Sequence, residues 1–289
     1  MTIDPWLLAL ALGSAFCYAL GLVLAQFGFR SETPISGACI SVPATMVFFV
    51  ALSPWTIDLT QWNRPSAAVF AGVGLMFPAL ATFLTFTANR LIGPQITGTF
   101  SNVTPVFALA FGMALLGEVP TSMQMLGVLA VVAGAALVVL RRGAQVPVGL
   151  AWAMGLPLVV AVMRALAQAI VKIGLVQWPN AFAAVTIGYV MSALMVLSVG
   201  WARGELPAWG WRRERLWFVV VGVLNGVSVL LVYAALARGP ITVVSALVAC
   251  FPLFVVVLNR VLRGDKSLTL GVGLGVVLTV VGIVVLVRG

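Results

Sequence analysis

The chain has 289 residues, of which 62% are hydrophobic and 8% charged, and its mean hydropathy is +1.17. Because soluble domains carry roughly 25% charged residues, this composition excludes a soluble protein and indicates an integral membrane protein. The net charge of +9 would suggest a nucleic-acid partner in a soluble protein, but here the arginines stand at the ends of apolar runs, where they contact lipid headgroups. We therefore expect membrane lipid, and no nucleic acid, as a partner.

Apolar runs of about 20 residues, the length of helix that spans a bilayer, follow one another along nearly the whole chain. The N-terminal MTIDPW has neither the basic segment nor the cleavage site of a signal peptide, so we expect the first run to remain as a span. Most connections are short, which predicts antiparallel neighbouring helices. The sequence therefore predicts an all-α membrane protein with ten transmembrane helices, at residues 6–28, 35–53, 67–89, 95–116, 121–140, 148–171, 181–202, 216–236, 241–262 and 268–287.

The second half of the chain repeats landmarks of the first. Each half holds a proline inside an apolar run, then a turn of glycine and an acidic residue, then an apolar run with two spaced glycines. Such matched landmarks indicate an internal duplication, with repeats at 1–143 and 144–289 of five helices each. The matched features are Pro105 with Pro252, Gly117-Glu118 with Gly264-Asp265, Gly127 with Gly275, Gly134 with Gly282, and Leu24-Ala25-Gln26 with Leu166-Ala167-Gln168.

An odd number of helices per repeat makes the second copy enter the membrane from the opposite side. The two copies are then inverted repeats, an arrangement that places a substrate site near the midplane between them. The ten spans, the glycine-acid turns and the glycine-spaced final helices resemble the drug/metabolite transporter superfamily, and within it the EamA-type exporters, which include exporters of aromatic amino acids. In the second turn Asp265, followed by Lys266, stands where the family usually has Glu. The resemblance implies a basket of helices around a central cavity that opens alternately to either face of the cell inner membrane.

Lysine and arginine predict the orientation, since cytoplasmic loops carry an excess of both. With ten spans the two termini share a side, and that side also holds four basic residues: Arg64, Lys172, Arg238 and Arg288. We therefore expect the termini to be periplasmic, because the opposite side holds eleven, namely Arg30, Arg90, Arg141, Arg142, Arg203, Arg212, Arg213, Arg215, Arg260, Arg263 and Lys266.

The sequence has few residues that could act in catalysis. The chain has no histidine, its seven acidic residues fall at span ends or in loops, and its three cysteines lie in apolar runs without a pairing pattern. We therefore expect no enzyme, no catalytic residue, no metal and no cofactor. Glu118 and Asp265 each precede a helix, whose N-terminal dipole favours negative charge; we interpret them as structural caps and not as coupling groups.

Arg164 is the one charged residue well inside an apolar run, eight residues before Lys172. A charge at that depth costs at least ~2.5 kcal/mol by insertion scales. Two alternatives stand equal at this point: the guanidinium faces a watery cavity, where it suits a substrate carboxylate, or it snorkels to a headgroup.

Polar residues form stripes in three of the apolar runs. Ser, Thr and Asn often serve only as hydrogen-bonding glue between membrane helices, but the stripes as a set predict a polar cavity lining. The predicted substrate-binding residues are Arg164, the stripe residues Gln95, Thr99, Asn102, Thr82, Thr85, Asn225 and Ser228, and the weaker candidates Tyr18 and Ser245. Three further polar residues accompany them: Asn89, Ser14 and Tyr233.

Pro105 and Pro252 stand at matching places inside their runs, so we expect paired kinks that act as hinges. The Gly-xxx-Gly spacings of membrane helices are common and do not by themselves indicate a dimer, so we expect a monomer. The sequence thus predicts a secondary transporter that exports amino acids, including aromatic and other neutral ones, and similar small metabolites by alternating access. A carrier of nucleotide sugars or phosphorylated metabolites is the alternative within transport, and a non-transporting structural or lipid-handling protein is the alternative outside it.

Overall fold

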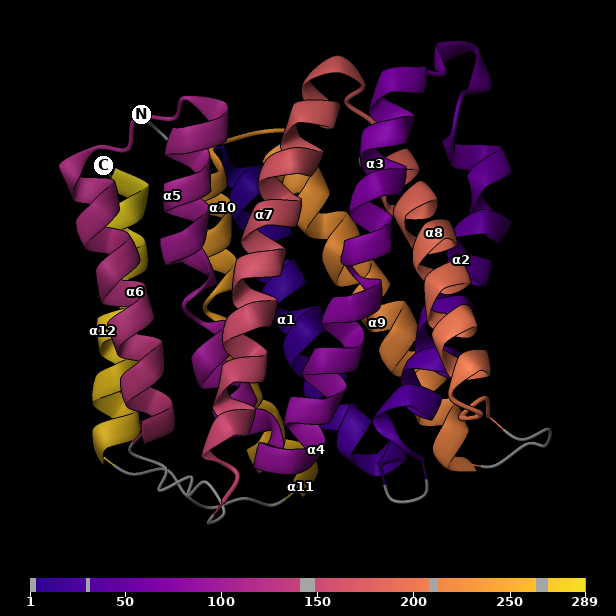
Figure 1. Cartoon of the computed structure of the whole chain (residues 1–289). Coiled ribbons are helices and arrows are strands. Elements are labelled where there is room, and N and C mark those ends of the chain that lie inside the picture. The colour runs from indigo at the N-terminus through magenta and orange to yellow at the C-terminus, as the bar shows by residue number, and fades with distance from the viewer. Residues whose placement is uncertain (1–3, 30–31, 141–148, 208–212, 264–269, 289) are drawn as a thin grey trace.

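The structure of the chain, a computed structural model, describes residues 4–29, 32–140, 149–207, 213–263 and 270–288. Within these ranges all regular structure is helical, which confirms the all-α part of the predicted fold (Figure 1). Seven segments are long and apolar enough to cross a membrane, and three shorter apolar helices accompany them. The helices are α1 Pro5–Gly28, α2 Pro34–Thr56, α3 Arg64–Met76, α4 Ala79–Ser101, α5 Thr104–Leu116, α6 Ser122–Leu140, α7 Gly155–Gln177, α8 Ala181–Ala202, α9 Arg213–Leu236, α10 Ile241–Val248, α11 Phe251–Arg263 and α12 Leu270–Arg288, with short 3₁₀ turns η1 Leu59–Gln61 and η2 Ala151–Met154.

Several helices begin where the local sequence supplies a capping side chain. The Asp4 carboxylate accepts a hydrogen bond from the amide of Trp6, and Thr33 and Asn63 do the same for Ser36 and Ser66. Proline follows each of these caps in the first turn, where its missing N–H costs no helical hydrogen bond. These starts follow directly from local sequence.

Three of the predicted spans are broken inside the bundle. The predicted helix 67–89 is divided at Phe77-Pro78 into α3 and α4, and α4 itself bends at Gly93, whose φ of 77° is the left-handed conformation that glycine tolerates. The predicted helices 95–116 and 241–262 are divided into α4 and α5 and into α10 and α11. Each break gives the bundle short half-helices at the depth of the cavity.

Pro105 and Pro252 are the second residues of α5 and α11. The expected kinks are therefore wrong in detail, because each helix ends and a new one begins, and the proline occupies a first-turn position that needs no N–H donor. The breaks nevertheless occur at matching places in the two halves. Pro157 likewise lies in the first turn of α7.

The final helices of the two halves, α6 and α12, lie side by side at one end of the bundle (Figure 1). A Cβ atom added at Gly127 would come within 2.9 Å of the Gly282 carbonyl oxygen, and one added at Gly134 within 2.8 Å of the Gly275 carbonyl oxygen. The backbones therefore touch at the glycines that the repeat comparison matched. The start of α1 and the end of α12 also lie on the same side of the bundle (Figure 1).

Candidate functional site

A cavity of about 60 Å³ lies at the centre of the bundle, between the two halves of the chain. By this measure one water needs about 10–15 Å³, so the cavity takes a few waters or a small organic molecule. All three tyrosines of the chain line it. Its lining comes from α1, from α3 and α4 around their break, and from α7, α8, α9 and α10: Tyr18, Phe77, Pro78, Ala81, Thr82, Thr85, Phe86, Arg164, Gln168, Tyr189, Asn225, Ser228, Val229, Val232, Tyr233 and Val248.

Arg164 projects from the middle of α7 into this cavity. Its guanidinium carbon lies 4.2 Å from the centroid of the Tyr18 ring and 5.9 Å from that of Phe77. Among the described residues no carboxylate pairs with it, and its Nε is buried without a hydrogen-bond partner. Of the two alternatives for this arginine, the structure agrees with the first: its guanidinium faces the cavity.

Other polar atoms of the lining are also unsatisfied. In the described part of the chain the Tyr18 hydroxyl, Gln168 Oε1 and Asn225 Oδ1 are buried and lack a hydrogen-bond partner. Buried polar atoms are nearly always paired in folded proteins, so several unpaired ones around a single space are suited to bind a polar ligand. None of the described lining residues is Asp or Glu, which leaves the Arg164 charge uncompensated.

A smaller pocket adjoins the cavity at the breaks of the discontinuous helices. It shares Arg164, Gln168 and Val248 with the main cavity and adds Ser101 and Thr104 from the α4 and α5 break and Ser245, Ala249 and Phe251 from the α10 and α11 break. The Ser101 hydroxyl is buried and unpaired among the described residues. Arg164 and Gln168 thus face both the main cavity and the paired breaks.

The structure brings most of the sequence-predicted residues together. Six of them line the cavity: Tyr18, Thr82, Thr85, Arg164, Asn225 and Ser228. The hydroxyl of Ser228 lies 2.9 Å from that of Ser14 and donates to the Ser14 carbonyl at 3.0 Å, so it also joins α9 to α1. Ser245 lines the smaller pocket, where its hydroxyl donates to the Thr242 carbonyl.

The predicted stripe through Gln95, Thr99 and Asn102 lies at the end of α4, whose last residue is Ser101, and the Asn102 backbone amide still donates to the Gly98 carbonyl at 3.1 Å. Asn102 is 1% exposed and is not among the described lining residues, and neither of its side-chain amide atoms has a described partner. The side chains of Gln95 and Thr99 lie outside the described part of the structure. Asn89, an accompanying candidate, accepts a hydrogen bond from Gln26 Nε2 at 2.9 Å, so it serves packing between α4 and α1.

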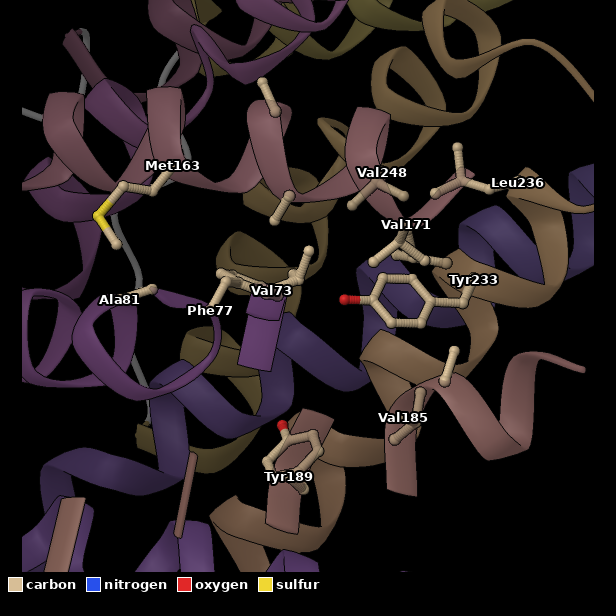
Figure 2. Close-up of a cluster of buried hydrophobic side chains, with 14 of the residues drawn as sticks. Val73, Phe77, Ala81, Met163, Val171, Val185, Tyr189, Tyr233, Leu236 and Val248 are labelled. Carbon is tan, nitrogen blue, oxygen red and sulfur yellow. The ribbon is translucent and has the colours of Figure 1, made fainter. Parts of the chain in front are cut away.

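Phe77, Gln168 and Tyr189 are among the lining residues that were not predicted. Figure 2 shows Tyr189 and Tyr233 with their hydroxyl ends directed toward the side where Phe77 and Val73 lie. One available signal was the rarity of tyrosine, since all three stand inside apolar runs. Another was the repeat match between Gln26 and Gln168, which marks a polar residue kept in the same place in both halves.

Glu118 lies outside the cavity, and its contacts differ from the expected cap of the following helix. It does not cap the helix that follows it, since Thr121 accepts from Gln124 N at the start of α6. Its carboxylate instead accepts from the amide of Ile241 at 2.9 Å, at the start of α10 in the other half, and pairs with Lys172 Nζ at 2.7 Å. Lys172 also donates to the Gly239 carbonyl at 2.8 Å. The matching turn at Asp265 lies outside the described residues.

Comparison with known proteins places these features in a family context. The EamA-like transporter family matches the chain twice, over residues 5–140 and 149–288. Among similar curated proteins, the threonine/homoserine exporter RhtA of Salmonella typhimurium (strain LT2) is 26% identical over 140 residues, which are 48% of this chain and 47% of that protein. RhtA of Escherichia coli (strain K12) is 27% identical over 125 residues, 43% of this chain and 42% of that protein. This chain therefore spans about half the length of the curated relatives it matches.

A solved crystal structure is similar over nearly the whole chain. It covers 96% of this chain and 97% of its own, with a TM-score of 0.75 at 17% sequence identity. At that identity the likeness concerns the fold alone. The helical arrangement around the cavity is thus one that another protein adopts.

Proposed function

Because the chain belongs to the EamA-like transporter family, which matches both of its halves, we propose that it exports small neutral amino acids and similar metabolites across the inner membrane by alternating access. The single observation that carries this proposal is Arg164, a cation in a central cavity with no carboxylate partner among the described residues. A guanidinium binds a carboxylate with two parallel hydrogen bonds, so the carboxylate of an amino acid supplies the missing partner. The proposed binding set is Tyr18, Thr82, Thr85, Arg164, Asn225 and Ser228, with Ser245 at its edge.

The size of the cavity bears on the substrate. A cavity of about 60 Å³ has room for a few water molecules. This volume favours a small amino acid over an aromatic one in this conformation. The curated relatives carry threonine and homoserine in their names. Threonine and homoserine are accordingly the first substrates to test, with phenylalanine as the larger comparison.

We also propose that the chain forms ten transmembrane helices in two inverted repeats, 1–143 and 144–289. The glycine contacts between α6 and α12 support this arrangement. Gly127 matches Gly275 in the repeat comparison but touches Gly282, while Gly134 matches Gly282 but touches Gly275. Such an exchange of contacts is what a two-fold axis produces, and an axis in the membrane plane relates inverted repeats.

Nucleotide sugars and phosphorylated metabolites, the alternative substrates, suit the cavity less well. A phosphate group carries about two negative charges at neutral pH, and Arg164 is the one cation among the described lining residues. A non-transporting role would leave the unpaired polar groups of the cavity without a use. Amino-acid export therefore accounts for more of the described site.

The decisive experiment is uptake of radiolabelled threonine and homoserine into proteoliposomes that contain the purified protein. We expect saturable uptake above that of protein-free vesicles, with phenylalanine a weaker competitor than unlabelled threonine. Uptake equal to that of empty vesicles for all neutral amino acids tested would refute the proposal. Equal competition by a sugar phosphate would favour the alternative carrier.

A further inference from the structure

Gln168 lies one helical turn beyond Arg164 on α7, so both side chains share a face of that helix. Both line the main cavity and the smaller pocket beside it. Gln168 is only 3% exposed, and its Oε1 has no hydrogen-bond partner in the described part of the chain. A buried carbonyl oxygen without a partner is unfavourable, so this oxygen is poised to accept a hydrogen bond from a ligand.

The matching residue of the first repeat shows what such a glutamine does when it has an internal partner. Gln26 Nε2 donates to Asn89 Oδ1 at 2.9 Å. Aligning Gly93-Pro94 with Gly239-Pro240 matches Asn89 to Ala235, which is fully buried and has no polar side-chain atom. The duplication therefore leaves Gln26 engaged within the protein and Gln168 free in the cavity.

The chemistry of an α-amino acid fits these two groups. Its carboxylate and ammonium are attached to the same carbon, so an ammonium must lie close to any carboxylate that Arg164 holds. The described cavity lining offers no Asp or Glu for that ammonium. A neutral carbonyl acceptor suits the task, because it binds the ammonium without neutralising the arginine that binds the carboxylate.

We infer that Gln168 accepts a hydrogen bond from the substrate ammonium while Arg164 binds the carboxylate, so that the site selects α-amino acids over carboxylic acids that lack the amino group. This inference rests on the proposed function. Gln168 is then the residue that determines specificity for the amino group.

The test compares threonine with 3-hydroxybutyrate, which is threonine without its amino group. Transport of both is measured in proteoliposomes for the wild type, Gln168→Met, Gln168→Glu and Gln26→Met. Methionine has nearly the volume of glutamine and lacks the carbonyl acceptor, whereas glutamate keeps an acceptor but adds a negative charge one helical turn from Arg164. Gln26→Met removes the matched glutamine that is engaged with Asn89.

We expect the wild type to prefer threonine and Gln168→Met to lower the ratio of threonine to 3-hydroxybutyrate transport by about tenfold or more, the effect of losing a hydrogen bond to a charged group. Gln168→Glu should lower transport of both compounds, because its carboxylate pairs with Arg164 one helical turn away and competes with the substrate carboxylate. Gln26→Met should lower transport of both compounds alike and leave the ratio unchanged.

An unchanged ratio in Gln168→Met, with threonine still transported, overturns the inference and leaves the proposed function standing. Absence of threonine transport in the wild type overturns the proposed function instead. If Gln168→Met does not yield folded protein, the wild type alone decides, since equal competition by threonine and 3-hydroxybutyrate for labelled threonine overturns the inference.

Discussion

The guanidinium of Arg164 stacks over the ring of Tyr18, with its carbon 4.2 Å from the ring centroid. This contact joins α7 of the second half to α1 of the first across the cavity. A cation over an aromatic face is attracted by the ring quadrupole, yet the buried Nε of the guanidinium has no hydrogen-bond partner among the described residues. The contact therefore orients Arg164 without occupying this donor.

Replacing Arg164 should affect carboxylate substrates alone. Arg164→Lys turns a planar fork into a point charge, so we expect weaker transport of free amino acids, and Arg164→Leu should lower it by about 10- to 100-fold. Amino-acid methyl esters, which have no carboxylate, should be indifferent to both changes. The measurement is uptake of acid and ester, normalised to the amount of reconstituted protein.

Arg238→Leu is the matched control, because Arg238 is half-exposed and lies 3.4 Å from Asp4, outside the cavity. It should leave transport of acid and ester unchanged. Equal losses for acid and ester in the Arg164 variants would mean that this arginine is structural.

The Glu118–Lys172 pair should stabilise the junction between the halves. Both side chains are largely buried, at 15% and 18% exposed, and the carboxylate also holds the start of α10. Glu118→Gln leaves the Lys172 charge without its carboxylate partner, so we expect a lower Tm. The two single variants and the double variant Glu118→Gln/Lys172→Met should give a coupling energy of about 0.5–3 kcal/mol.

Thermal unfolding in detergent provides the measurement, with about 2–4 °C expected per kcal/mol. Strictly additive losses in the double variant would show that the two side chains do not act on each other. A local cap of α6 would predict that additive result.

The packing of α6 on α12 should depend on Gly134. An added Cβ would lie 2.6 Å from the Thr279 amide nitrogen, so Gly134→Ala must push the helices apart and should lower Tm by about 2–12 °C. Gly273→Ala is the control on α12, since nothing lies within 4 Å of its added Cβ, and it should be neutral or slightly stabilising. A neutral Gly134→Ala would contradict the close packing.

The orientation can be tested with reporters that are active only in the cytoplasm. From the count of eleven basic residues against four, we expect no signal from a fusion after Gly289 and a clear signal from an insertion between Trp209 and Trp211. The opposite pattern would place both termini in the cytoplasm.

Coupling to protons is expected to be absent. None of the described cavity-lining residues is Asp or Glu, and the chain has no histidine, whereas proton-coupled carriers usually hold such a group within the membrane. Preloading vesicles with unlabelled threonine should accelerate uptake of the labelled compound. Concentrative uptake driven by an imposed proton gradient alone would contradict this expectation.

The sequence by itself determined that this is an all-α membrane protein. In an apolar run of bilayer length the backbone N–H and C=O groups have no water to bind, so they must pair within a helix. It also predicted the duplication, in line with the two family matches, and the position of Arg164 well inside an apolar run, since both are read from spacing along the chain. The polar stripes led to four cavity residues, Thr82, Thr85, Asn225 and Ser228, because neighbours on one helical face stay neighbours after folding.

Only the tertiary structure decided which partners those residues meet. Gln26 and Gln168 occupy matching positions, yet one bonds to Asn89 and the other faces the cavity, because the helix opposite carries Asn in one half and Ala in the other. Glu118 holds a helix that starts more than a hundred residues later. Local spacing fixes which residues share a helix face, but contacts between distant helices depend on how the whole bundle packs, and that packing places Arg164 over Tyr18 in the cavity.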